Sequence, residues 1–334
     1  MTSNSAKPLL SVIDLVVDFD TPRGVVRAVD GVSFDIWPGE VLSFVGESGC
    51  GKTVTALALL RLLPQVGAHV RSGRVLFDGV DLLGLDSVAL RAIRGKRISM
   101  IFQDPTSSLN PMKTIERQIE EAIKLHQPAL TRIQIRDRVV HLMVTVGIAD
   151  ARKRMKEYPH MWSGGMRQRA MIAMAMANEP VLLIADEPTT GLDTTVQAQV
   201  LDVLRDVRSE TGAAMLLITH NLGVVAEIAD RVAVIYAGRI VETRGVEELF
   251  TRPLHPYTQG LMSCQPSFET ARGSLRAIGG QPPQLDGPSI GCTFRDRCAL
   301  RFDRNDCATI VPQLSGSTAT GGQVACHAVG GVLS

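Results

Sequence analysis

The most informative segment of the chain is Gly46-Glu47-Ser48-Gly49-Cys50-Gly51-Lys52-Thr53, called the glycine loop below. It matches the pattern G-x-x-x-x-G-K-[ST], between the apolar run Val41–Val45 and a helix-forming segment, Thr53–Leu63. Glycines allow a tight loop whose backbone N–H groups surround phosphate oxygens at a helix N-terminus. Lys52 is then expected to reach the β- and γ-phosphates, and the Thr53 hydroxyl to ligate Mg²⁺. We interpret Cys50 as a small filler of the loop.

A second apolar strand ends in two carboxylates. Val181–Ala185 is followed directly by Asp186 and Glu187. Asp186 is placed to contact Mg²⁺, directly or through water, and Glu187 to polarise an attacking water. Such an acidic pair alone is also typical of a capped turn. In combination with the glycine loop, the acidic pair indicates a site for phosphoryl transfer.

Three further features stand at the ends of predicted strands or helices. Ser163-Gly164-Gly165-Met166-Arg167-Gln168, the signature segment, opens a helix with a glycine-rich N-terminus, a site for anionic phosphate. Gln103 follows the predicted strand Arg97–Phe102, and His220 follows the predicted strand Ala213–Thr219. A single histidine in such a place is more often structural, but its position in this ordered set favours a functional role.

Composition excludes several classes of protein. The chain has 334 residues, which predicts about two domains. With 45% hydrophobic and 21% charged residues it is neither disordered nor collagen-like nor a coiled coil. Lys+Arg 35 against Asp+Glu 34 gives no overall basic field for nucleic acid. No apolar run is long enough to span a membrane, and the polar segment 1–8 lacks the core of a signal peptide, so we expect a cytosolic chain.

The character of the sequence changes twice along the chain. Leu9–Phe19 and Val25–Ile36 are predicted strands, separated by a Thr-Pro-Arg-Gly turn. Further along, alternating strands and helices predict a mainly parallel sheet covered on both faces. The stretch 111–159 is polar and helical in period. From about residue 251 the chain is rich in Pro, Gly and Cys with weak periodicity. We expect residues 251–334 to form a separate, loop-rich C-terminal extension.

Taken in order, these motifs resemble the nucleotide-binding subunits of ATP-binding cassette (ABC) transporters, from about Leu9 to Phe250. The signature reads Trp162-Ser163-Gly164-Gly165-Met166 where Leu-Ser-Gly-Gly-Gln is commoner. Gly191-Leu192-Asp193 departs from the usual Ser-Ala-Leu-Asp of the dimer-contact loop. Neither change removes a chemical group that the chemistry needs.

The resemblance implies an α/β fold of the P-loop NTPase, ABC type. This has a RecA-like core with an antiparallel β subdomain and a helical subdomain, plus a small loop-rich C-terminal domain. We expect the ATPase domain at residues 1–250, with the helical subdomain at about 104–160, and the C-terminal domain at 251–334. Two such chains would form a sandwich, in which each glycine loop faces the partner's signature segment.

The resemblance also implies a role for each motif. ATP would bind the glycine loop, and Ser163, Gly164 and Gly165 would cap the ATP of the opposing subunit. Glu187 would orient water, His220 would contact the γ-phosphate and Gln103 would sense Mg²⁺ and the membrane subunit. Phe19 is the expected adenine-stacking aromatic, with a plain core phenylalanine as the alternative. The predicted sets are catalytic (Lys52, Gln103, Glu187, His220), Mg²⁺-binding (Thr53, Gln103, Asp186) and nucleotide-binding (Phe19, Gly46 to Thr53, Ser163, Gly164, Gly165, Asp193).

The C-terminal extension indicates which subfamily of ABC ATPases the chain resembles. Leu254-His255-Pro256-Tyr257, Gly280-Gln281-Pro282-Pro283 and the run from Gly291 to Cys298 resemble the oligopeptide/dipeptide importer ATPases. This implies a subunit at the cytoplasmic face of the inner membrane that powers peptide import. Its partners would be a second, related ATPase chain, two transmembrane permease subunits and an extracytoplasmic solute-binding protein, without nucleic acid. The alternatives are a homodimer, an importer of nickel or another small solute, and a soluble cassette ATPase.

Four cysteines cluster in the extension: Cys292, Cys298, Cys307 and Cys326. Four thiolates in one small module suit a four-iron cluster or a tetrahedral zinc, and the irregular spacing disfavours a zinc ribbon. Similar importer ATPases can carry a [4Fe–4S] cluster on such a motif. We therefore predict a structural [4Fe–4S] cluster, with zinc, unligated thiols and a redox-sensing module as alternatives.

Overall fold

The structure is a computed structural model that describes residues 7–264, 278–301, 304–316 and 322–329. Most of the polar segment 1–8 therefore lies outside the described residues. The chain divides into two compact units. The first comprises Met1–Ile36, Val41–Leu83 and Thr219–Ser334, and the second comprises Trp37–Glu40 and Gly84–Ile218. None of the helices in the described part of the chain has the length and apolarity of a membrane span.

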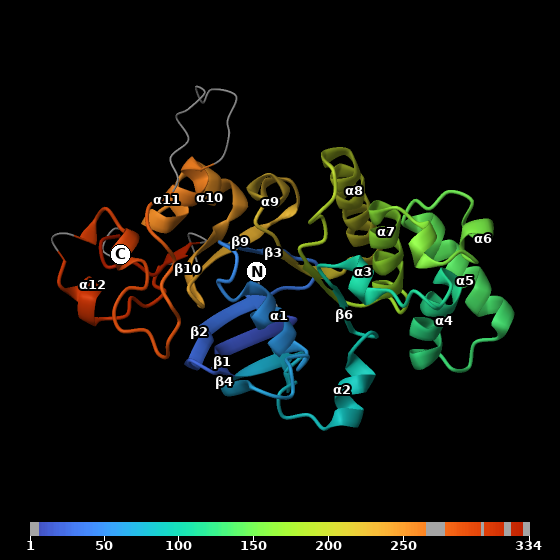
Figure 1. Ribbon diagram of the computed structural model, residues 1–334, viewed down its shortest axis with the longest axis horizontal. Helices are drawn as coiled ribbons and strands as arrows, with labels where there is room; N and C mark the ends of the chain where they lie inside the picture. Colours follow the sequence, from blue (N-terminus) through green and yellow to red (C-terminus); the bar gives the residue numbers. More distant parts are fainter. Residues whose placement is uncertain (1–6, 265–277, 302–303, 317–321, 330–334) are drawn as a thin grey trace, which may run out of the picture. The chain divides into compact units, whose positions relative to one another are not determined.

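The first unit begins with an antiparallel sheet in the order β2-β1-β4-β5, seen in blue in Figure 1. Its strands are β1 (Leu10–Thr21), β2 (Gly24–Ile36), β4 (Ala68–Phe77) and β5 (Val80–Asp81). In β1, Val17 pairs with Val29 of β2 and Val70 of β4. Valine suits such a pleated, half-buried surface, and the two predicted N-terminal strands are confirmed.

The glycine loop joins a buried strand to a helix in this unit. β3 (Val41–Val45) is buried throughout and pairs in parallel with β9 (Arg231–Tyr236). β9 pairs antiparallel with β10 (Arg239–Gly245), and β10 with β11 (Gln323–Val324) of the extension. α1 (Lys52–Leu59) follows the loop and ends four residues before the predicted end at Leu63. The helix stops early because Arg61 takes a left-handed backbone, with φ 51°.

The second unit contains three parallel strands in the order β8-β7-β6. They are β6 (Ile98–Ile101), β7 (Leu182–Asp186) and β8 (Ala214–Ile218). Every residue of β7 and β8 is buried, as expected for parallel strands covered on both faces. The helices α7 (Gly164–Ala175) and α8 (Thr194–Thr211) pack on each other.

The stretch predicted to be helical is helical. It contains α4 (Ile115–His126), α5 (Arg132–Thr145) and α6 (Ala151–Arg154), and Figure 1 shows α4 and α5 in green beside α7. Ile115, Ile119 and Ile123 form the apolar stripe of α4, and all three are fully buried. Shorter elements of the unit are α2 (Ser87–Ile93), α3 (Pro105–Ser108) and the 3₁₀ turn η1 (Pro159–Met161).

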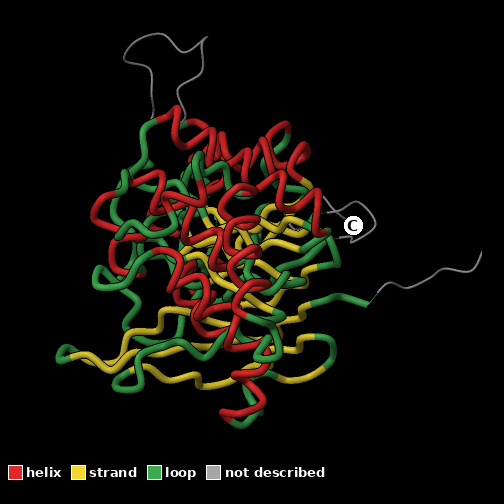
Figure 2. Tube along the Cα trace, turned by 90° about the vertical axis from the view of Figure 1, so that its right-hand side faces the viewer, coloured by secondary structure: helices red, strands yellow, loops and turns green. Residues whose placement is uncertain are grey.

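The rest of the first unit is α9 (Leu222–Ile228), α10 (Val246–Thr251) and the extension, which is loop-rich as predicted. Its elements are α11 (Pro256–Ser263), the 3₁₀ turn η2 (Arg295–Arg297), α12 (Asp306–Thr309) and β11. Figure 2 shows the strands of the described chain in yellow and its helices in red.

Candidate functional site

The glycine loop is shaped by close backbone contacts within the first unit. A Cβ atom at Gly46 would overlap the carbonyl oxygen of Ile235, and one at Gly51 would overlap that of Ala28. Gly51 also has φ 101°. Only glycine fits a backbone with this conformation and this lack of space. The loop is therefore pressed against the strands that surround it, independently of any ligand.

Lys52 fills the centre of the loop. Its ammonium donates to the carbonyl oxygens of Gly46 at 2.7 Å and Glu47 at 2.9 Å, and the residue is only 5% exposed. The Cys50 sulfur lies 3.6 Å from the same nitrogen. Burial raises the pKa of the Cys50 thiol, so the sulfur is protonated at neutral pH. This agrees with its interpretation as a filler.

In the second unit, the carboxyl end of β7 carries the predicted acidic pair. Asp186 is the last residue of the strand and is buried. Glu187 has a left-handed backbone, φ 46°, held by its N–H, which donates to Ile218 at 2.8 Å. Such backbone geometry in a non-glycine residue is frequent at functional sites.

Two polar side chains hold the Glu187 carboxylate. The Gln103 amide donates to Glu187 Oε2 at 3.0 Å, and the Thr190 hydroxyl donates to the same oxygen at 2.7 Å. The structure thus brings Gln103 and Glu187 into contact, which the sequence did not predict. Thr190 was not predicted; its signal in the sequence is a hydroxyl three residues after the acid, in the turn that leaves the strand.

The signature segment forms the start of α7. Ser163 is the N-cap, and its hydroxyl accepts a hydrogen bond from the Met166 N–H. A Cβ at Gly165 would overlap Cγ1 of Val196 in α8, so this glycine permits the close approach of the two helices. Asp193 caps α8, accepting from the Val196 N–H at 2.9 Å. A pocket beside these helix starts is lined by Ser163, Gly165, Arg154 and Arg169, among others.

His220 and Phe19 belong to the first unit. His220 is exposed and follows Thr219, whose N–H donates to Phe44 of β3 at 3.2 Å. That bond places the turn carrying His220 at the end of the strand that leads into the glycine loop. Phe19 is half-buried in β1, where it pairs with Val26 and Ala68.

The extension contacts the glycine loop through residues that the sequence analysis did not single out. The Glu47 N–H donates to the Tyr257 hydroxyl at 2.9 Å. Both Glu47 carboxylate oxygens accept from the Arg297 guanidinium, at 2.7 and 2.9 Å. Tyr257 and Arg297 lie inside the motifs by which the extension was recognised, but nothing in their spacing indicates this contact.

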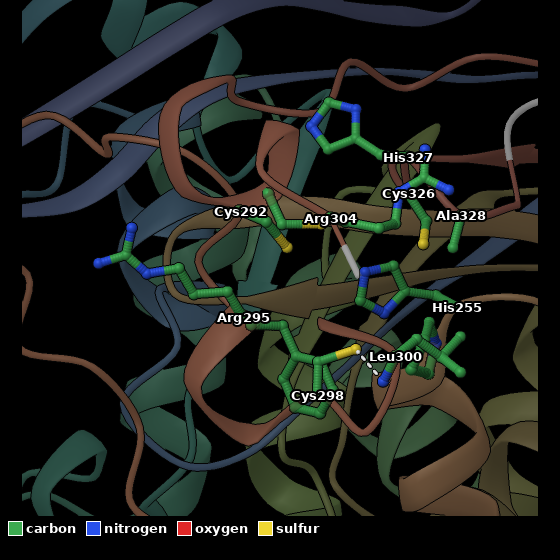
Figure 3. Close-up of a pocket in the computed structure, with 12 residues that line it drawn as sticks. His255, Cys292, Arg295, Cys298, Leu300, Arg304, Cys326, His327 and Ala328 are labelled. Carbon is green, nitrogen blue, oxygen red and sulfur yellow. Dashed lines mark hydrogen bonds between the residues drawn. The ribbon is translucent and has the colours of Figure 1, made fainter. Parts of the chain in front are cut away.

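Cys292, Cys298, Cys307 and Cys326 of the extension line one pocket, called the cysteine pocket below, together with His255, Arg304 and His327. Figure 3 shows the sulfurs of Cys292, Cys298 and Cys326 turned toward a common space. Burial raises the pKa of Cys292 to about 11 and also raises the pKa values of Cys307 and Cys326. All four are free thiols. Within the described residues, no group of three or more His, Cys, Asp or Glu side chains is arranged to hold a metal ion. The structure supports a shared pocket but not the predicted ligation.

Two family descriptions match the chain. "ABC transporter" matches residues 29–190, and "Oligopeptide/dipeptide transporter, C-terminal region" matches residues 241–307. Among solved structures, the dimeric cassette MJ0796 is 24% identical with a TM-score of 0.64, covering 71% of this chain and 98% of that one. The cassette cbiO1 of Clostridium perfringens is 27% identical with a TM-score of 0.61, covering 73% and 91%. The predicted cassette fold is confirmed.

Relatives of known name are more similar still. The probable peptide ABC transporter ATP-binding protein y4tR of Sinorhizobium fredii is 50% identical over 317 residues, 94% of each chain. The dipeptide transport ATP-binding protein DppD of Bacillus subtilis is 48% identical, over 88% of each. The peptidoglycan transport ATP-binding protein YejF of Agrobacterium fabrum is 53% identical over 90% of this chain. The chain spans only about half of that protein, 54% of its length.

Proposed function

The chain belongs to the ABC family of transporter ATPases, in the branch with the oligopeptide/dipeptide C-terminal region, and we propose that it hydrolyses ATP to power peptide import. The observation that carries this proposal is a complete glycine loop in a chain that also matches the oligopeptide/dipeptide transporter region over residues 241–307. The import would run through separate permease subunits, as the resemblance to the importer ATPases implies.

In the proposed reaction the glycine loop binds the phosphates of ATP through its backbone N–H groups. Lys52 would exchange its carbonyl acceptors, Gly46 and Glu47, for β- and γ-phosphate oxygens. Glu187, held by Gln103 and Thr190, would orient the attacking water. His220 would contact the γ-phosphate from the turn after β8.

The donors assigned to Mg²⁺ fit that ion. The Thr53 hydroxyl, the Gln103 amide oxygen and the Asp186 carboxylate are all oxygen ligands, which Mg²⁺ prefers. When bound, the ion neutralises charge on the β- and γ-phosphates. The Gln103 amide nitrogen already donates to Glu187, which leaves the amide oxygen as the ligand atom.

A second ATPase subunit completes the proposed site. Ser163, Gly164 and Gly165 would cap the nucleotide of the opposing subunit with the N-terminus of α7, and Asp193 would hold the contact loop at the start of α8. Phe19 would stack on adenine. In this assignment residues 1–250 form the ATPase domain, with the helical subdomain at 104–160 receiving the permease, and residues 251–334 form the C-terminal domain.

The decisive experiment is to tag the chain at its native expression level, solubilise membranes gently and identify what co-purifies. We expect to recover two multi-span permeases, a second cassette ATPase and an extracytoplasmic solute-binding protein, with this chain at the cytoplasmic face of the inner membrane. Peptide-loaded binding protein should then stimulate ATP hydrolysis by the reconstituted complex. Stimulation by a nickel-loaded binding protein instead would show that the importer carries nickel and not peptides. Recovery in the soluble fraction with DNA or ribosomes would overturn the transporter assignment.

We also propose that the cysteine pocket holds a [4Fe–4S] cluster with a structural role. Support comes from the chemistry of four thiols lining one pocket, which is the ligand set of such a cluster. Binding needs the thiols deprotonated and their side chains turned inward. Anaerobically purified protein should be brown and contain iron and acid-labile sulfide, both lost in Cys292→Ser but not in the control Cys264→Ser. Zinc without sulfide, or neither element, would refute the cluster.

A further inference from the structure

We propose that Arg297 of the extension is a positioning residue for the glycine loop, acting through Glu47, so that ATP affinity depends on the extension. The proposal rests on the ATPase function proposed above. It is drawn from contacts within the first unit alone, between residues 250 positions apart in the chain.

Glu47 is held at each of its polar groups. Its N–H donates to the Tyr257 hydroxyl at 2.9 Å, and its carbonyl accepts from Lys52 at 2.9 Å. Its carboxylate receives two parallel bonds from Arg297, 2.7 and 2.9 Å long. A two-pronged pair of this kind fixes orientation as well as distance. Contacts with Tyr257 and Arg297, which lie outside the glycine loop, therefore fix the conformation of its first turn.

Arg297 is itself rigidly held. Its side chain is 5% exposed, and it donates to the carbonyls of Gly279 at 2.9 Å and Ile278 at 3.3 Å. Its guanidinium also lies 5.7 Å from the centre of the Tyr236 ring and 6.0 Å from that of Phe294. Because these contacts fix the guanidinium, they also fix the carboxylate that it binds.

Tyr257 is anchored by the same packing. It is fully buried, and its ring lies 4.5 Å from the Tyr236 ring and 5.5 Å from the Phe294 ring, measured between centroids. The aromatic cluster of Tyr236, Tyr257 and Phe294 thus supports both groups that hold Glu47. Tyr236 ends β9, the strand beside β3, so the cluster ties the extension to the sheet at the loop.

The consequence concerns phosphate binding and not the water-activating groups. Glu47 belongs to the loop whose backbone surrounds the phosphates, and before ATP binds it supplies one of the two carbonyls that hold Lys52. A displaced Glu47 would therefore change both the shape of the loop and the starting position of the lysine. Gln103, Glu187 and Thr190 are not part of this network. Loss of the pair should therefore raise the Kd and KM for ATP while kcat changes little.

The test compares Arg297→Met, Glu47→Gln and the double variant in the full chain. The probes are a fluorescent ATP analogue for Kd and steady-state hydrolysis for KM and kcat. Each single change should raise Kd and KM about tenfold, with kcat within about twofold. The double variant should be no weaker than either single one, because both remove the same interaction. Arg297→Lys, which keeps the charge but loses the fork, should recover part of the affinity.

Arg244→Met is the matched control. Arg244 is an equally buried arginine of the same unit that donates to the Arg252 carbonyl at 2.7 Å. Its loss should lower thermal stability without changing Kd. The proposal would be overturned if Arg297→Met left the Kd for ATP unchanged. It would also be overturned if the increases in Kd caused by the two single changes multiplied in the double variant. If Arg297→Met does not fold, Glu47→Gln provides the test, because the Glu47 side chain is 27% exposed and its substitution should not prevent folding. The proposal still requires Glu47→Gln to bind ATP more weakly. Absence of ATP hydrolysis in the unaltered, reconstituted protein would instead refute the proposed function.

Discussion

The Gln103 amide donates to the Glu187 carboxylate at 3.0 Å, across 84 positions of sequence. The bond links the second residue after β6 to the first residue after β7, at the carboxyl edge of neighbouring parallel strands. The same side chain thus holds the group proposed to orient water, and its amide oxygen is the atom assigned to Mg²⁺ in the proposed site. A movement of the segment that contains Gln103 would therefore displace the Glu187 carboxylate directly.

The first prediction concerns that carboxylate. Glu187→Gln should bind ATP normally but lower its turnover at least a hundredfold, since an amide cannot polarise water as a carboxylate does. The closed dimer should accumulate. Phosphate release and size-exclusion chromatography with ATP measure both effects. Glu179→Gln, which alters an exposed glutamate of the same unit paired with Arg138, is the control and should keep normal turnover. Normal turnover in Glu187→Gln would show that another group activates water.

The second prediction concerns the loop lysine. Lys52→Ala should raise the Kd for ATP by a factor of ten or more, because it removes the ammonium that reaches the phosphates. It also leaves the carbonyls of Gly46 and Glu47 without this donor. Binding of a fluorescent ATP analogue measures the change. Lys124→Ala, an exposed lysine paired with Glu120, should bind as the unaltered protein does. Equal affinities would contradict a phosphate role for Lys52.

The third prediction tests the contact between α7 and α8. Gly165→Ala should lower the free energy of unfolding by about 1–3 kcal/mol, since its Cβ would overlap Val196. Val196→Ala in the same chain should restore part of the loss by removing the overlapping methyl group. Gly245→Ala is the control, because its Cβ would meet nothing within 4 Å. Urea denaturation provides the measurement. Equal stability of the Gly165 and Gly245 variants would disprove the close approach.

The fourth prediction concerns pH. The Arg27 guanidinium bonded to Asp18, with Arg71 beside it, lowers the pKa of that buried carboxyl below its ordinary 3.8. The ionised pair therefore stabilises the fold fully above about pH 3.8, and this contribution is lost as the pH falls through the lower folded pKa.

Asp18→Asn should accordingly lose about 1–3 kcal/mol at pH 7 and show a shallower fall in stability below pH 4. The measurement is urea denaturation between pH 7 and pH 3. Asp202→Asn is the control, since its exposed pair with Arg205 should contribute less than about 1 kcal/mol. A pH dependence identical in Asp18→Asn and the unaltered chain would show that Asp18 does not carry this contribution.

Several elements were predictable because their signals are local. The valine-rich strands β1 and β2 and the buried runs of β3, β7 and β8 were located to within about two residues. β4 was missed, because its centre, Arg71-Ser72-Gly73-Arg74, is polar and breaks the apolar alternation. It forms a strand because β1 offers it a partner along most of its length. Tertiary pairing overrides weak propensity in such a case.

The glycine loop, the acidic pair after β7 and the family could be identified from the sequence, because each depends on residue types at short, fixed spacings. The packed structure was needed to show that Tyr257 and Arg297 hold Glu47, that Gln103 and Thr190 hold Glu187, and that four cysteines line one pocket. Hydrogen bonds and ion pairs depend on distances of about 3 Å, and separation along the chain carries no information about such distances until the chain is packed.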